Sequence, residues 1–288
     1  MKFDTEGTYT LQYKAVDECG NETIEDRTVD VVSLRTVLYT DGTFIINEKS
    51  SDINANVARH GAATNVYAPL DPNGAAIESY YFPQENSRPW HYERSAIQRV
   101  EIGDNIKPKA TRNWFYDCSN LISCDFDKLD TSEVTTMYNM FNSCSALTNL
   151  DLSNFDTSNV TDMANMFSWC STLASLDISG FNTSNVTTMS TMFSGCSALT
   201  NLDLSSFDTS KVTNTSTMFR VCSELTTIFA SDSFVTTLVS ASVDMFDRTT
   251  KLTGGAGTRW SSSNANDATY AHIDGGTASP GYFTLKQA

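Results

Sequence analysis

Four aspartates recur at one position of a repeated sequence, and they are the side chains best placed for chemistry. The four are spaced 26 residues apart: Asp125, Asp151, Asp177 and Asp203. Each lies in a short segment in which polar and apolar residues alternate. If these segments are stacked strands, the carboxylates point outward about 5 Å apart, where like charges repel. A calcium ion held by Asp151, Asp177 and Asp203, or a cationic or hydroxyl-rich ligand, would relieve that repulsion. Hydration of the carboxylates would relieve it as well, so both explanations remain open.

Other side chains could contact a ligand at this surface or near it. Asn149, Ser175 and Asn201 lie two residues before three of the aspartates, so they would share the same face. Trp169 occupies a repeat position at which neighbouring repeats have small or aliphatic residues. An exposed aromatic at a variable position is either a contact residue or a side chain packed against Phe167 or the next turn.

Catalytic chemistry has little support in the sequence. His60, His91 and His272 lie far apart in three different contexts, and there is no G-x-S-x-G, H-E-x-x-H or phosphate-binding glycine loop. No C-x-x-C pair points to a zinc or redox site. We therefore expect no enzyme activity, no catalytic residues and no cofactor beyond the calcium considered above.

A repeat of 26 residues must position these candidates. Five cysteines mark the period, each with a phenylalanine three residues before it and a leucine three residues after it: Cys118, Cys144, Cys170, Cys196 and Cys222. A fixed period of about 20–50 residues is typical of solenoids, in which each repeat is one coil stacked on the last. A single inward column of cysteines predicts buried, free thiols, because parallel neighbours have poor disulfide geometry.

The pattern within one repeat predicts three local structures. Leu150 and Leu152 alternate with polar residues, which indicates a short strand with one buried face. Turn-forming residues follow at 156–159. Apolar residues then recur at steps of three and four, which predicts a short helix: Val160, Met163, Met166, Phe167 and Cys170. The sequence thus predicts an α/β solenoid of short parallel strands and short helices, with β-rich caps at both ends.

The repeats also carry a family resemblance. The string L-x-x-L-D-L-S-x-F-D-T-S-x-V-T-x-M-x-x-M-F-x-x-C is matched by residues 147–170 and 199–222, and nearly by 173–196; in 199–222, Thr215 replaces the first methionine. It resembles the 26-residue leucine-rich repeat of the BspA-like bacterial surface proteins. The resemblance implies a right-handed, horseshoe-like scaffold used for adhesion or surface recognition. Related repeats also appear in phage virion proteins.

The chain divides into four regions on these grounds. Residues 1–33 alternate as a hairpin and resemble the end of a bacterial immunoglobulin-like domain; residues 34–113 form a β-rich N-terminal cap. Within that cap we expect a hairpin over 34–47, a loop-rich segment over 48–89 and a strand within 95–103. Residues 114–253 are the repeat array, and 254–288 form a closing segment with a strand pair over 270–284 that resembles the end of such arrays.

Charge and hydropathy restrict the partners. The net charge of −15 disfavours nucleic acid, because binding phosphates needs clustered Lys and Arg. No stretch approaches the roughly 18 apolar residues of a membrane helix, and no basic-then-apolar signal opens the chain. We expect either a piece of a longer secreted protein or a chain exported without a signal, as a virion component would be.

The favoured function is a recognition or adhesion module at the bacterial cell surface. It would bind a protein or glycan of a host or bacterial surface through Asn149, Asp151, Ser175, Asp177, Asn201, Asp203 and Trp169. The alternative is a phage virion protein, of the tail or decorating the capsid, with a host-binding or structural role. The sequence leaves the ligand and the oligomeric state open.

Overall fold

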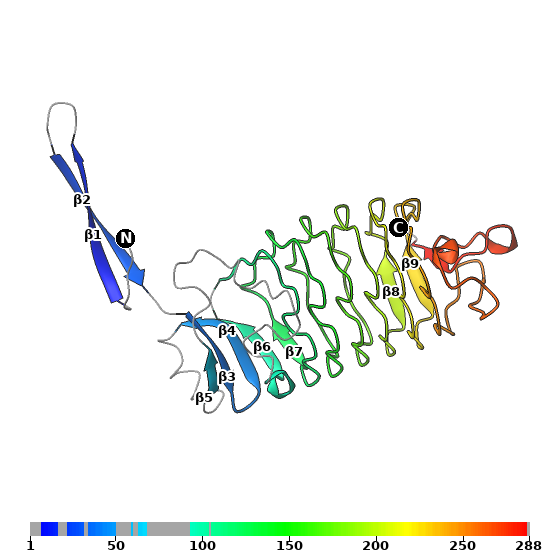
Figure 1. Ribbon diagram of the computed structural model, residues 1–288, viewed down its shortest axis with the longest axis horizontal. Coiled ribbons are helices and arrows are strands. Elements are labelled where there is room, and N and C mark those ends of the chain that lie inside the picture. Colours follow the sequence, from blue (N-terminus) through cyan, green and yellow to red (C-terminus); the bar gives the residue numbers. More distant parts are fainter. Residues whose placement is uncertain are drawn as a thin grey trace.

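The computed structural model describes residues 7–16, 22–31, 34–49, 59, 63–67, 93–103 and 105–286 (Figure 1). Strands β1 (Gly7–Val16) and β2 (Glu22–Val31) pair antiparallel, with Gly7 opposite Val31. This is the hairpin that the alternating sequence predicts. Within the described ranges no other strand joins this pair. The immunoglobulin-like origin of the hairpin therefore stays a prediction.

A five-stranded sheet of order β5-β3-β4-β6-β7 leads into the repeats. Strands β3 (Leu34–Tyr39) and β4 (Thr43–Lys49) form the predicted second hairpin, and β5 (Ala63–Tyr67) adds to β3 from the segment that we expected to be loop-rich. The 3-10 helix η3 (Arg94–Ala96) precedes β6 (Arg99–Ile102). β6 pairs parallel with both β4 and β7 (Ser123–Asp125), so the predicted strand within 95–103 is present and connects the cap to the first coil.

Successive 26-residue coils lie directly on one another, as the green-to-yellow part of Figure 1 shows. A row of parallel bridges joins five of them through Thr136, Asp162, Thr188, Asn214 and Ala241. Beside this row, main-chain N–H groups donate to carbonyls of the next coil, for example Met137 to Asp162 at 2.9 Å and Phe141 to Met166 at 2.9 Å. Each coil therefore satisfies main-chain polar groups through its neighbours, as buried backbone requires.

Parallel strands form in only some of the coils. β8 (Asn201–Leu204) pairs in register with β9 (Thr227–Ala230), and β10 (Phe283–Leu285) from the end of the chain pairs with β9. Residues 149–152 and 175–178 have the same alternating sequence but no assigned strand, so the strands predicted there are absent. Leu152, Leu176 and Ile178 are nevertheless buried. In these coils the alternating sequence indicates which side chains face the core. It does not indicate strands joined by a ladder of hydrogen bonds.

The short helices predicted for each coil are also absent: the segments are successions of turns. Each segment contains residues with positive φ, such as Asn165 at 58° and Trp169 at 60°. Left-handed residues interrupt the repeated right-handed conformation that an α-helix needs. Main-chain groups bond within tight turns, as Cys170 N–H does to Phe167 O at 3.1 Å, or to the next coil. The apolar residues spaced three and four apart therefore point inward from successive turns, and they do not form one side of a helix.

Identical side chains stack through the core of the array. The rings of Phe141, Phe167, Phe193 and Phe219 follow one another with centroid separations of 5.9, 5.9 and 5.8 Å. Such offset contacts add to the benefit of burying the rings.

The cysteine column runs beside the phenylalanines, and its thiols are buried and free as predicted. The Cys170 thiol donates to Phe141 O at 3.2 Å, and the Cys196 thiol to Phe167 O at 3.1 Å. Burial raises the pKa of Cys196 to about 12, so this thiol stays protonated at neutral pH. Thr249 takes the cysteine position in the last coil, and its hydroxyl donates to Phe219 O in the same way.

The C-terminal segment covers the last coil. Tyr282 and Phe283 are fully buried, and their rings meet those of Phe246 and Phe234 edge-on at 5.1 and 4.8 Å. Instead of the expected strand pair, this segment has β10, a single bridge from Ile273 to Phe283, and the 3-10 helices η4 (Ala268–Tyr270) and η5 (Gly276–Ala278). In the part of the chain that the structure describes, no helix is long and apolar enough to cross a membrane.

Candidate functional site

The predicted aspartate row lies together on one surface of the array. Asp151 and Asp177 are exposed and Asp203 is half-buried, and the charges of Asp203 and Asp151 both act on Asp177. Asn149, Ser175 and Asn201 are exposed two residues before them. The structure therefore brings six of the seven predicted ligand-binding residues to one face of the coils.

Hydrogen bonds within the turns already use these carboxylates. Asp151 accepts from Ser153 N–H at 2.9 Å, Asp177 from Ser179 N–H at 3.0 Å and Asp203 from Ser205 N–H at 3.0 Å. For Asp177 the main-chain and then the side-chain hydrogen bond of Ser179 lower the pKa. This turn motif is a standard use of aspartate, and it stabilises the charged form. Among the described residues, no group of three or more His, Cys, Asp or Glu side chains could hold a metal ion.

The turn carboxylates outside this row follow the same rule. Asp130, Asp156 and Asp208 accept from Ser132, Ser158 and Ser210 N–H, each at 2.9 Å. In Asp156 the bonds from Ser158 lower the pKa. Both acidic columns thus shape turns. In the aspartate row, the charge of Asp203 is also neutralised, because Lys286 forms an ion pair with it.

Trp169 lies apart from this face, in a column at another corner of the coils. We define the corner column by the residues that share its repeat position: Asp117, Ser143, Trp169, Gly195, Val221 and Arg248. All six have positive φ, between 59° and 76°. The N–H groups of Ser143, Trp169, Gly195 and Val221 donate to the next coil at 2.7, 2.7, 2.8 and 2.8 Å. Six different residue types therefore share a left-handed φ at this position.

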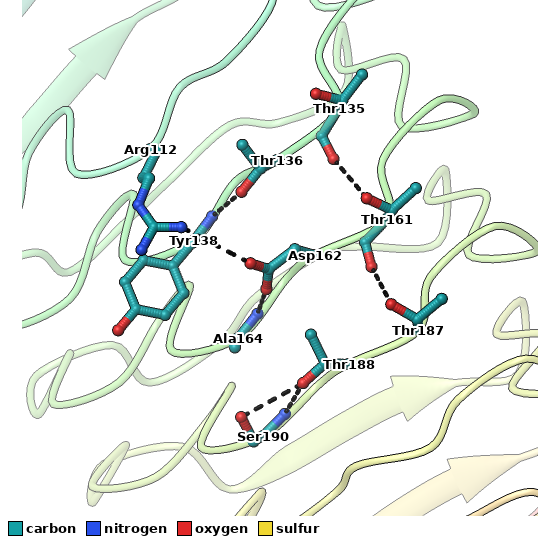
Figure 2. Close-up of polar contacts among 10 residues, drawn as sticks. All are labelled: Arg112, Thr135, Thr136, Tyr138, Thr161, Asp162, Ala164, Thr187, Thr188 and Ser190. Atoms are coloured by element: carbon teal, nitrogen blue, oxygen red, sulfur yellow. Dashed lines mark hydrogen bonds and ion pairs between the residues drawn. The ribbon is translucent and has the colours of Figure 1, made fainter. Parts of the chain in front are cut away.

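Figure 2 shows a polar face that our sequence predictions did not include. Thr161 and Thr187 are exposed, and each hydroxyl donates to the main-chain carbonyl of the preceding threonine, at 3.1 Å in both cases. The sequence signal was the Val-Thr pair that recurs in each repeat. Because these hydroxyls bond to the main chain of the neighbouring coil, the column ties successive coils together.

An arginine braces three coils beside the threonines in the same view. The Arg112 guanidinium lies 3.9 Å from the centre of the Tyr138 ring, and its nitrogen is 3.9 Å from a carboxylate oxygen of Asp162 (Figure 2). Burial raises the pKa of Asp162, while the N–H of Ala164 and the charge of Arg112 oppose that shift. The Asp162 carboxylate accepts the Ala164 N–H at 2.9 Å and lies beside Arg112, so the cluster forms a structural contact between coils.

Hollows on the described surface include two of similar volume. One, of about 540 Å³, is lined mainly by polar residues that include Ser216, Asp244 and Asn266. The other, of about 490 Å³, lies between the end of the N-terminal cap and the first coil and is lined by Lys107, Lys128 and Asp130 among others. Of the three histidines, His60 and His91 lie outside the described residues, and His272 Nδ1 lies 2.8 Å from Ile273 O.

Comparison with known proteins gives one match. The chain matches a family described as "Mycoplasma protein of unknown function, DUF285" over residues 109–230 and again over 170–276. Together these ranges span more than half of the 288 residues and contain the repeats described above. No curated protein matches the chain, and no solved structure does.

Proposed function

Because the chain belongs to the DUF285 family, whose function is unknown, we propose a role from its own geometry. The proposed role is a non-enzymatic recognition module that binds a protein or glycan of a host or bacterial surface. Its scaffold would be a leucine-rich-repeat-like solenoid of the BspA type, displayed outside the bacterial cell. We assign it no cofactor.

The corner column is the observation that carries this proposal. Buried columns of the array repeat one residue type, as the stacked phenylalanines do. The corner column instead keeps the φ angle fixed and changes the side chain from acidic to small, aromatic, aliphatic and basic. Trp169 and Arg248 of this column are exposed, and Asp117, Ser143 and Val221 are half-buried. A scaffold that holds the main chain and varies the side chain at one position suits recognition, because binding depends on a few specific contacts on a rigid support.

Binding to fixed epithelial cells and to purified mucin would test the proposal. The test variant changes Ser143, Trp169, Val221 and Arg248 to glycine, which tolerates positive φ, so the main chain is kept while the side chains are removed. A matched variant, the aspartate-face variant, changes Asn149, Ser175 and Asn201 to alanine on the face that carries the aspartate row. We expect the wild-type chain to bind, and the corner variant to lose at least tenfold in affinity.

The control variant decides where recognition occurs. If only the aspartate-face variant lost binding, the recognition site would lie on the predicted aspartate face and not at the corner column. A wild-type chain that binds neither probe, or a corner variant that binds equally well, would contradict the proposal. Circular dichroism and thermal melting of each variant would confirm that the fold is intact.

A further inference from the structure

We propose that Trp169, lying on Gly195 of the following coil, is the stacking platform of a saccharide-binding subsite. This inference rests on the proposed recognition function and names its ligand class: a neutral pyranose at the exposed surface of the indole. The argument concerns how the indole is held, why Gly195 is required, and why a sugar suits it better than a protein surface.

The main chain holds Trp169 in a conformation that a bulky residue seldom adopts. Its φ is 60°, and its N–H donates to Ser194 O at 2.7 Å. The residue before it, Ser168, is buried and its hydroxyl donates to the same carbonyl at 3.3 Å. Bulky residues with positive φ are uncommon and persist where the surroundings fix them. The coil therefore determines where the indole points.

The indole of Trp169 packs against the main chain at Gly195. A Cβ added to Gly195 would lie 2.7 Å from Trp169 Cδ2 and 2.8 Å from Cε3, closer than carbon atoms approach without overlap. The indole thus occupies the space that a side chain would fill, against the main chain of the next coil. In the corner column Gly195 is the one member without a side chain, and it directly follows the one aromatic member.

Half of the tryptophan surface remains in water despite this contact. Trp169 is 50% exposed, although burying it would be favourable. With one part of the indole on Gly195, the remaining surface is a rigid aromatic plane. The π face of an indole is electronegative and attracts the polarised C–H groups of a sugar ring, while the sugar hydroxyls remain in water.

The surroundings favour a sugar over a protein partner. Protein hot spots lie in fully desolvated apolar patches with a rim around them. The other large apolar side chains that are exposed in the described chain lie at different repeat positions or in other regions: Ile122, Leu238, Val243 and Leu285. Close to Trp169 in sequence are Ser171, half-buried, and Thr172, exposed. A single exposed indole whose neighbours in sequence are hydroxyl residues suits one sugar ring better than an apolar protein patch.

The test uses polyacrylamide conjugates of galactose, glucose, mannose and N-acetylglucosamine, whose multivalency compensates for weak single contacts. We expect the wild-type chain to bind at least one conjugate. Trp169→Ala should weaken that binding about tenfold or more, and Trp169→Phe less, since a smaller ring still stacks. Gly195→Ala should weaken it as well, although it keeps the tryptophan, because the new Cβ displaces the indole.

Leu238→Ala is the matched control, since Leu238 is a comparably exposed apolar residue, at 55%, in a different position. It should bind like the wild type. Other members of the corner column carry side chains at the same φ, so Gly195→Ala is expected to fold, which a melting curve checks. Three results would overturn the assignment: no conjugate bound, full binding by Trp169→Ala, or full binding by a folded Gly195→Ala. If the chain bound cells but none of the conjugates, the saccharide subsite would be excluded and the proposed function would still hold.

Discussion

Asp274 illustrates how much one side chain contributes at the end of the array. Its carboxylate accepts N–H bonds from Ala256 and Thr258 at 2.9 Å each and from Gly276 at 2.9 Å, together with the Thr258 hydroxyl at 2.7 Å. Burial alone would raise its pKa, but these hydrogen bonds lower it to about 2. Two separate parts of the closing segment, residues 256–258 and Gly276, therefore depend on one negative charge.

This pKa predicts an acid-labile closing segment. The folded value is lower than the unfolded value, so Asp274 stabilises the fold above about pH 4, and the stabilisation is lost as the pH falls towards 2. The difference corresponds to about 2 kcal/mol. Asp274→Asn should lower the free energy of unfolding by a similar amount at pH 7 and reduce its fall between pH 5 and 2, as measured by urea denaturation. An equal effect from the exposed Asp244→Asn would contradict this assignment.

At the scale of the repeated element, one coil departs from its sisters inside the core. Thr215 stands where other coils have the buried Met137, Met163 and Met189. It is buried, and its hydroxyl finds no hydrogen-bond partner within the described chain. A buried polar group without a partner costs about 1–3 kcal/mol.

Thr215→Val should therefore stabilise the protein, because it removes the hydroxyl and keeps the shape. We expect the free energy of unfolding to rise by about 1 kcal/mol, which thermal and urea denaturation would detect. Thr215→Ser is the matched control: it keeps the hydroxyl, loses a buried methyl group and should destabilise. A valine variant less stable than the wild type would show that the hydroxyl is satisfied in solution.

The element scale is also where sequence reasoning succeeded and failed. The 26-residue period located the stacked phenylalanines and the free thiols, because a core side chain must recur where coils repeat. The same apolar spacing wrongly predicted helices, because turns with left-handed residues can place side chains inward at steps of three and four. Asn139 and Asn165, which tolerate positive φ, were an available signal, but Trp169 and Val221 at positive φ gave none.

The candidate site was predictable in the same partial way. Trp169 stood out because it departs from the repeat, and the structure finds it half exposed. Packing of Trp169 against the next turn was one of the two alternatives, but the particular contact with Gly195 was not predicted, because it depends on the side-chain direction at a corner whose φ the sequence did not reveal. Asp151 and Asp177 are exposed, as the alternation predicted, whereas the serine N–H bonds that their carboxylates accept were not predicted.

At the scale of the whole molecule, the stack depends on its ends being covered. Phe283 is fully buried and its ring contacts those of Phe219, Phe234 and Phe246. A terminal coil without such a cover would expose its apolar interior, which is why repeat arrays need capping segments.

Phe283→Ala should loosen the closing segment before the rest of the array. Removing a buried phenylalanine costs about 3–5 kcal/mol. Hydrogen exchange should therefore accelerate over residues 254–286 first, with residues 134–222 still protected. Leu285→Ala, in the same strand but 52% exposed, should change exchange little. Equal loss of protection along the whole array would instead show that the molecule unfolds as one unit.

The main-chain hydrogen bonds that join each coil to the next also determine how the chain would respond to tension. If the two ends are pulled apart, load falls on one coil-to-coil contact at a time, and each contact that yields releases 26 residues. At about 3.3–3.6 Å per extended residue, that is a lengthening of about 90 Å. A molecule tethered between two surfaces in flow would thus extend in equal steps, dissipating work at each one while the remaining coils stay folded.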